Sequence, residues 1–173
     1  MTEAPAAYSP DELRQRYADE ANKRRRTDGV RQYIELKNTE LDRDPFVDPG
    51  FTRDAVVEET DVVIVGAGWA GMTTAASLTD EGVTSYRIID KAGDFGGTWY
   101  WNRYPGCMCD VESYCYLPLL ERTGYMPTRK YAHAQEIFEY AQLLGRTFDM
   151  YPHALFQTEV KEMVWQEDTQ RWL

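Results

Sequence analysis

A short apolar run that leads directly into spaced glycines constrains this chain more than any other feature. Residues 61–65 read Asp-Val-Val-Ile-Val, and Gly66 to Gly71 follow the pattern G-x-G-x-x-G. A β-branched apolar run that ends at glycine predicts a buried parallel strand, and the small residues of 72–78 predict a helix after it. In such a unit the first glycine permits a tight turn, the second lets backbone approach a pyrophosphate, and the third allows close helix–strand packing. The pattern therefore predicts a nucleotide-binding unit with a pyrophosphate at the helix N-terminus.

An acidic residue at the end of the next strand limits which dinucleotides could bind. Residues 85–90 read Ser-Tyr-Arg-Ile-Ile-Asp, which predicts a second strand that ends at Asp90. Asp90 follows Gly71 by about 20 residues, the spacing of an acid that accepts hydrogen bonds from the adenosine ribose. A carboxylate there disfavours a 2′-phosphate, because two negative groups would meet. The residues therefore indicate FAD or NAD at this site and not NADP; a glycine-rich turn without a ligand is the alternative.

An aromatic, glycine-containing segment follows the second strand, where a plain NAD-binding domain would have an ordinary helix. Residues 91–110 read KAGDFGGTWYWNRYPGCMCD, and Gly96-Gly97 is a second place where backbone can approach a ligand closely. The crowded aromatic side chains suit a flat ring system such as isoalloxazine, which needs apolar walls and a few polar groups. The alternative is an aromatic minicore that fixes this loop to the sheet.

From Asp61 to about Tyr116 the chain resembles the flavin-dependent Baeyer–Villiger monooxygenases. The most specific stretch is GGTWYWNRYPG at 96–106, and Asp-Val-Glu-Ser at 110–113 continues it. The long N-terminal arm is similar to that of the subgroup acting on large cyclic ketones and steroids. The resemblance implies an α/β fold: a Rossmann-like FAD-binding domain of three layers, with a parallel sheet and a β-meander, incomplete here and preceded by a helical extension.

The resemblance also assigns roles to individual positions. The implied FAD contacts are Gly66, Gly68, Ala70, Gly71, Asp90, Gly97, Thr98, Trp99, Tyr100, Trp101, Asp110, Tyr114 or Tyr116, and the backbone of Val160. Met108, Cys109 and Asp110 are the implied NADP contacts. Asp110 is further implied to orient a catalytic arginine that this sequence does not contain, and a loop cap is its alternative role.

The activity implied by the resemblance is oxygen insertion next to a ketone carbonyl. In that family NADPH reduces FAD, O2 adds to give a C4a-peroxyflavin, and its anion attacks a ketone to yield an ester or lactone. The expected partners are thus a small-molecule ketone, bulky or cyclic, and O2. Two alternatives stay open: a stand-alone FAD- or NAD-binding module, and a related flavin N- or S-monooxygenase.

Residues 1–60 are predicted to form a helical arm and linker ahead of an FAD-binding portion at 61–173. Ser9-Pro10-Asp11-Glu12 is a capping-box start, and Leu13, Tyr17 and Ala21 then form one narrow apolar stripe. Such a stripe cannot fold alone, so the arm is expected to pack on the rest of the same enzyme. The basic run 23–26 reads as a solvated helix end, with a nucleic-acid patch as the alternative.

The C-terminal residues predict one more crossover and a hairpin. A helix is predicted over 135–144, a third parallel strand over 155–158, and a hairpin from 160 to 173 with its turn at 166–170. The second arm of that hairpin has only three residues, which leaves an apolar edge exposed. The sequence also lacks a second G-x-G-x-x-G and the histidine motif of the family. We therefore expect this sequence to be the N-terminal part of a longer enzyme and inactive alone.

Charge and cysteine content exclude several classes of protein. The net charge of −10 argues against a partner in nucleic acid or an anionic membrane surface. No apolar run approaches the roughly 18 residues of a membrane span, and residues 1–7 carry no secretory signal. Cys107, Cys109 and Cys115 lack the C-x-x-C spacing of structural metal sites, so they are predicted to be buried, reduced thiols without a metal. A cytoplasmic protein is expected.

Overall fold

Within the described residues, the N-terminal unit of the chain contains a capped helix and a short 3-10 turn. The computed structural model describes residues 8–34, 39 and 42–173, and it divides into two compact units, Met1–Arg43 and Asp44–Leu173. Residues 1–7, on which the absence of a secretory signal depends, lie outside the described residues. Helix α1 spans Pro10–Arg24, and the 3-10 helix η1 spans Gly29–Gln32.

The predicted capping box of α1 is confirmed. The Glu12 N–H donates to Ser9 Oγ over 3.3 Å, and the Ser9 N–H donates to Glu12 Oε2 over 2.7 Å. Leu13 and Tyr17, in the predicted apolar stripe, are 39% and 75% exposed. Helix formation here is therefore specified locally, by capping and charge, rather than by burial.

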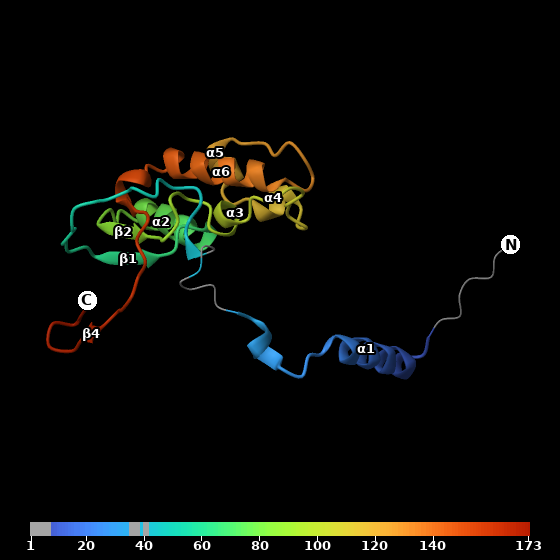
Figure 1. Cartoon of the computed structure of the whole chain (residues 1–173). Helices are drawn as coiled ribbons and strands as arrows, with labels where there is room; N and C mark the ends of the chain where they lie inside the picture. The colour runs from blue at the N-terminus through green and yellow to red at the C-terminus, as the bar shows by residue number, and fades with distance from the viewer. Residues whose placement is uncertain (1–7, 35–38, 40–41) are drawn as a thin grey trace. The chain divides into compact units, whose positions relative to one another are not determined.

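The second unit is built on a parallel sheet. Strands β1 (Val62–Val65), β2 (Tyr86–Ile89) and β3 (Ala154–Leu155) lie in the order β1-β2-β3, and both pairings are parallel. Helix α2 (Trp69–Asp80) connects β1 to β2, and helix α6 (Ala134–Thr147) precedes β3. Figure 1 shows both helices beside the sheet. The predicted α/β architecture and both crossovers are confirmed.

Shorter elements lie between these parts. They are α3 (Thr98–Trp101), α4 (Ser113–Tyr116), α5 (Leu120–Thr123), the 3-10 helix η3 (Tyr151–His153), and the antiparallel pair β4 (Trp165–Gln166) and β5 (Arg171–Trp172). The hairpin is present as predicted, although the regular strand begins at Trp165 and not at 160. Within the aromatic segment, one helical turn replaces the expected irregular loop.

The core lies on the helix-covered face of the sheet. Ile137, Phe138, Ala141 and Leu144 of α6 are buried, as the helical periodicity predicted. On β1 only Ile64 is buried at 8% exposure, whereas Val63 and Val65 are 53% and 55% exposed. The prediction of a strand buried on both faces is therefore wrong for the described residues, because helices cover only the face that carries Ile64. In that described part, no helix is long and apolar enough to cross a membrane.

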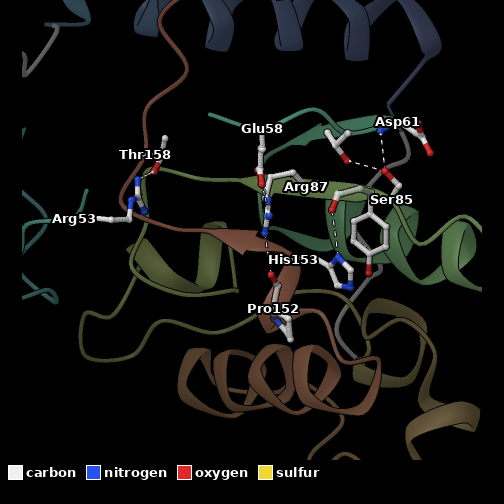
Figure 2. Close-up of polar contacts among 10 residues, drawn as sticks. Arg53, Glu58, Asp61, Ser85, Arg87, Pro152, His153 and Thr158 are labelled. Atoms are coloured by element: carbon white, nitrogen blue, oxygen red, sulfur yellow. Dashed lines mark hydrogen bonds and ion pairs between the residues drawn. The ribbon is translucent and has the colours of Figure 1, made fainter. Parts of the chain in front are cut away.

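Residues 44–60, called the strap below, belong to the second unit. Arg53 donates to the Phe156 carbonyl (3.1 Å) and to Thr158 Oγ1 (2.7 Å). Figure 2 shows Glu58 paired with Arg87 of β2, through two N–H···O contacts of 2.6 Å. The sequence predicts that this segment is part of the arm, with a boundary between residues 60 and 61. In the structure its side chains are hydrogen-bonded to β2 and to the residues after β3.

Candidate dinucleotide-binding site

The turn after β1 requires glycine at two positions for different reasons. Gly66 has φ +106, a conformation that L side chains rarely adopt, and its N–H donates to the Ile89 carbonyl over 2.8 Å. A Cβ on Gly71 would lie 1.9 Å from the Gly66 carbonyl oxygen and 3.2 Å from a methyl of Ile64. The predicted close packing of helix on strand at Gly71 is thus present in the structure.

The N-terminus of α2 presents bare backbone. Gly68 is the N-cap residue, and it offers no side chain to cap the helix. The Met72 N–H donates to the Gly68 carbonyl over 3.0 Å, so the N–H groups of 69–71 precede the first helical bond. Three amides at the positive end of a 12-residue helix form a fitting cradle for a pyrophosphate.

The second glycine pair, Gly96-Gly97, lies directly against the first glycine segment. The Gly96 N–H donates to the Ala67 carbonyl over 3.0 Å. Gly97 has φ +53, and a Cβ there would lie 2.8 Å from the Gly68 Cα. The sequence predicts two separate places where backbone can approach a ligand. The structure brings the two together, with α3 beginning where they touch.

Asp90 ties the end of β2 to the same turn. Its Oδ2 accepts from the Ala67 N–H over 2.6 Å, and its Oδ1 accepts from the Ala92 N–H over 2.8 Å. A carboxylate has about four lone-pair sites, so acceptor capacity is left for a ribose hydroxyl. The acid therefore lies at the mouth of the glycine turn, fixed by backbone on both sides.

The aromatic segment divides into buried and exposed members. Trp99 and Tyr100 are 6% and 2% exposed, and the Trp99 Nε1–H donates to the Tyr116 hydroxyl over 2.8 Å. The Tyr100 hydroxyl donates a hydrogen bond to the carboxylate of Asp44. These two side chains form the aromatic minicore that the sequence left open as an alternative. Thr98 and Trp101 are exposed and remain available to a ligand.

The remaining candidates lie after α3. Met108 and Asp110 are exposed, and Cys109 between them is buried, with its N–H donating to the Ala132 carbonyl over 3.0 Å. Tyr114 is 60% exposed, while Tyr116 and Val160 are half-buried. Of these six, Tyr116 lies against the site, through its hydrogen bond with Trp99 and its ring contact with Trp69.

The cysteines differ in accessibility. All three thiols are free, with Cys107 and Cys109 buried and Cys115 exposed. The expectation of a buried thiol is wrong for Cys115, because it lies on the outer side of the short helix α4. Among the described residues, no cluster of His, Cys, Asp or Glu has the composition of a metal site.

Two features of the site were missed by sequence reasoning. Asp44 accepts a hydrogen bond from Tyr100, although it belongs to the arm and linker predicted over residues 1–60; the local signal is an Asp before Pro-Phe, typical of an Asx turn. Trp69, at a variable position of the glycine motif, packs edge-on against Tyr116 and Tyr140, with ring centroids 6.4 and 6.0 Å away. Its Nε1–H is buried without an acceptor among the described residues.

Comparisons with known proteins agree with this geometry. Residues 64–141 match the family of NAD(P)-binding Rossmann-like domains. The chain is 47% identical over 167 residues to Baeyer-Villiger monooxygenase 4 of Dietzia sp. (strain D5), which covers 95% of this chain and 27% of that protein. The chain thus spans about a quarter of the length of the curated relatives it matches.

Solved structures show the same relationship. The polycyclic ketone monooxygenase from Thermothelomyces thermophila superposes with a TM-score of 0.84 at 39% identity, over 94% of this chain and 28% of that one. OTEMO, in complex with FAD and NADP, superposes with a TM-score of 0.62 at 32% identity, over 65% of this chain and 22% of that one. Over almost its whole length, therefore, this chain is similar in sequence and fold to a part of known Baeyer–Villiger monooxygenases, and that part includes a Rossmann-like domain.

Proposed function

We propose that this chain is the FAD-binding N-terminal part of an NADPH- and O2-dependent Baeyer–Villiger monooxygenase that converts bulky or cyclic ketones to esters or lactones. The observation that carries the proposal is the contact between the two glycine segments at the N-terminus of α2. Bare helix amides, close backbone and an acid at the end of β2 are together what a dinucleotide requires. The similarity to ketone monooxygenases supports the choice of reaction.

Within this proposal the residues of the chain bind and orient the cofactor. The amides of 69–71 hold the pyrophosphate, Asp90 accepts from the adenosine ribose, and Thr98 and Trp101 lie along the cofactor from α3. Bound FAD supplies the oxidation–reduction chemistry of the reaction. The burial of Trp99 and Tyr100 keeps water away from the inner side of α3.

Asp110 is proposed to act outside the glycine turn. Its exposed carboxylate is available to a guanidinium, and a charge-assisted hydrogen bond would orient an arginine near the reacting ketone. Met108 and Cys109 beside it are the proposed contacts of NADPH, while Tyr114 or Tyr116 and the Val160 backbone complete the FAD contacts. The proposed setting is cytoplasmic, with a ketone and O2 as partners and the arm packed on the same enzyme.

The experiment is flavin binding by the full gene product and its Gly68→Ala variant. Gly68 has φ −86, and a Cβ there meets only the Gly97 Cα at 3.5 Å, an ordinary contact. The variant should therefore fold normally, while its methyl group occupies space needed by the pyrophosphate. We expect a yellow wild-type protein and a variant whose Kd for FAD rises at least about tenfold, or about 1.4 kcal/mol.

Activity is then measured as NADPH consumption with a polycyclic ketone, and the product is identified by mass as the ketone plus one oxygen atom. A colourless wild-type protein that takes up no FAD contradicts the proposal, and so does a Gly68→Ala variant with unchanged affinity. A flavoprotein that oxidises amines or sulfides and no ketone would support FAD binding but contradict the assigned reaction.

A further inference from the structure

The first residues of the strap are bonded to the helix that begins at Gly97. The Tyr100 hydroxyl donates to Asp44 Oδ2 over 2.6 Å, and the Phe46 N–H donates to Asp44 Oδ1 over 2.9 Å. One carboxylate therefore fixes both its own turn and α3. Asp44 is half-buried and Tyr100 is 2% exposed, so little water competes for this bond.

An arginine held among aromatic rings joins the strap to two helices. The Arg103 guanidinium carbon lies 3.8 Å from the ring centre of Phe46, 4.5 Å from that of Tyr100 and 4.2 Å from that of Phe138. Its Nε–H also donates to the Tyr100 carbonyl over 2.7 Å. The three rings come from the strap, α3 and α6, so cation–π attraction binds these segments together.

A third contact reaches the loop on the other side of the glycine pair. A Cβ on Gly93 would lie 2.4 Å from a methyl of Val47, so the strap packs tightly on the loop between β2 and α3. The strap residues 44–47 thus hold the chain before and after Gly96-Gly97.

The helix they hold cannot keep its place alone. Helix α3 is one turn long, and an isolated turn of helix is unstable in water. Gly97 at its start has the conformational freedom of glycine, and its Cα packs against Gly68. The spacing between the two glycine segments therefore depends on what holds α3.

We propose that Asp44 and Phe46 are positioning residues for the cofactor: by holding α3 through Tyr100 and Arg103, they keep Gly97 against Gly68 and so set the affinity for FAD. Neither residue contacts the glycine turn; each acts through α3. This inference rests on the proposed function, because it assumes that the ligand of the glycine turn is FAD.

The test compares FAD affinity in variants of the full gene product. Asp44→Ala removes both bonds of the carboxylate, and we expect the Kd for FAD to rise about tenfold, the effect of one hydrogen bond to a charged acceptor. Glu58→Ala is the matched control, because it removes two hydrogen bonds that join the same strap to Arg87 of β2 rather than to α3. Its Kd should stay within about twofold of wild type even if its Tm falls equally.

Two more variants separate positioning from general stability. Asp44→Asn keeps one acceptor oxygen for the Phe46 N–H, and its amide N–H can donate to the Tyr100 hydroxyl, so it should restore part of the affinity. Tyr100→Phe removes the hydroxyl that bonds Asp44 and the Gly93 backbone, and adding Asp44→Ala to it should cost less affinity than Asp44→Ala costs alone.

The outcomes are distinct. An unchanged Kd in Asp44→Ala overturns the inference, as does an equal loss in Glu58→Ala. A wild-type protein that takes up no FAD contradicts the proposed function, and the inference falls with it. FAD uptake by wild type together with full affinity in Asp44→Ala contradicts the inference alone.

Discussion

The two glycine segments of the site are held in place by different means. Gly66 to Gly71 lie between a strand and a 12-residue helix that continue directly from them, so their geometry follows from neighbours in the sequence. Gly96-Gly97 lead only into a single helical turn, and their position depends on Ala67, Phe138 and the strap. The first segment is locally encoded, whereas the second is placed by distant residues. Substitutions in the two should therefore fail in different ways.

The largest effect is expected at Gly71. A methyl group in Gly71→Ala would lie 1.9 Å from the Gly66 carbonyl oxygen, which belongs to backbone and cannot move aside. We expect the free energy of unfolding to fall by more than about 3 kcal/mol, measured by urea denaturation. Gly68→Ala is the control, because it meets only an ordinary contact. Equal stability of the two variants would mean that the first segment is less tightly determined than its geometry indicates.

Gly97→Ala should lower the free energy of unfolding less than Gly71→Ala does, and it should disturb the conformation of the second glycine segment. Both the left-handed backbone and the 2.8 Å approach to the Gly68 Cα oppose a side chain, and we expect a loss of about 2 kcal/mol. Gly106 also has a positive φ, +82, but nothing lies within 4 Å of a Cβ there, so Gly106→Ala is the comparison. The difference between these variants in thermal unfolding isolates the contact between the glycine segments. If both lose the same stability, the contact contributes nothing.

Alkaline pH should weaken the hold on the second segment. Burial, reinforced by the hydrogen bond to Asp44, raises the pKa of Tyr100 from 10.0 to about 12. The stabilisation is complete below pH 10 and is lost as pH rises toward 12, because the unfolded chain releases its proton first. The Tm should fall over this range, and Tyr100→Phe should make the fall shallower. Burial also raises the pKa of Tyr125 to about 12, so some decline remains in the variant.

The parts of the fold and site that the sequence predicts are those that depend on neighbouring residues, as the first glycine segment does. The glycine turn, α2 and α6 were predictable because spacing and periodicity act within a few residues. The minicore of Trp99 and Tyr100 remained one of two alternatives, since aromatic composition suits a protein core and a flavin equally. The bond from Asp44 to Tyr100 crosses 56 positions, and that from Arg53 to Phe156 crosses 103. No local sequence pattern predicts hydrogen bonds between residues so far apart in the chain. One-sided burial of β1 was missed because valine suits either face of a strand.

The smallest effect compares two tryptophans, one inside the first glycine segment and one just after the second. Trp69→Phe removes an N–H that has no acceptor among the described residues, so its loss of unfolding free energy should come from ring packing alone. Trp99→Phe removes the donor to Tyr116 and should cost about 1 kcal/mol more. The comparison is made by urea denaturation. A larger loss in Trp69→Phe would show that its indole has a partner in the full protein.

The positions of the tryptophans also allow the intrinsic fluorescence of the chain to report on two regions separately. Trp165 and Trp172 of the hairpin are 41% and 68% exposed, with ring centroids 5.4 Å apart, while Trp99 is buried two residues after Gly97. In a Trp101→Phe background, which lacks the exposed indole of α3, emission that iodide quenches comes from the hairpin, and emission that resists iodide comes from beside the glycine segments. A single fluorescence titration can thus follow, at the same time, whether the hairpin is covered and whether the glycine segments are occupied.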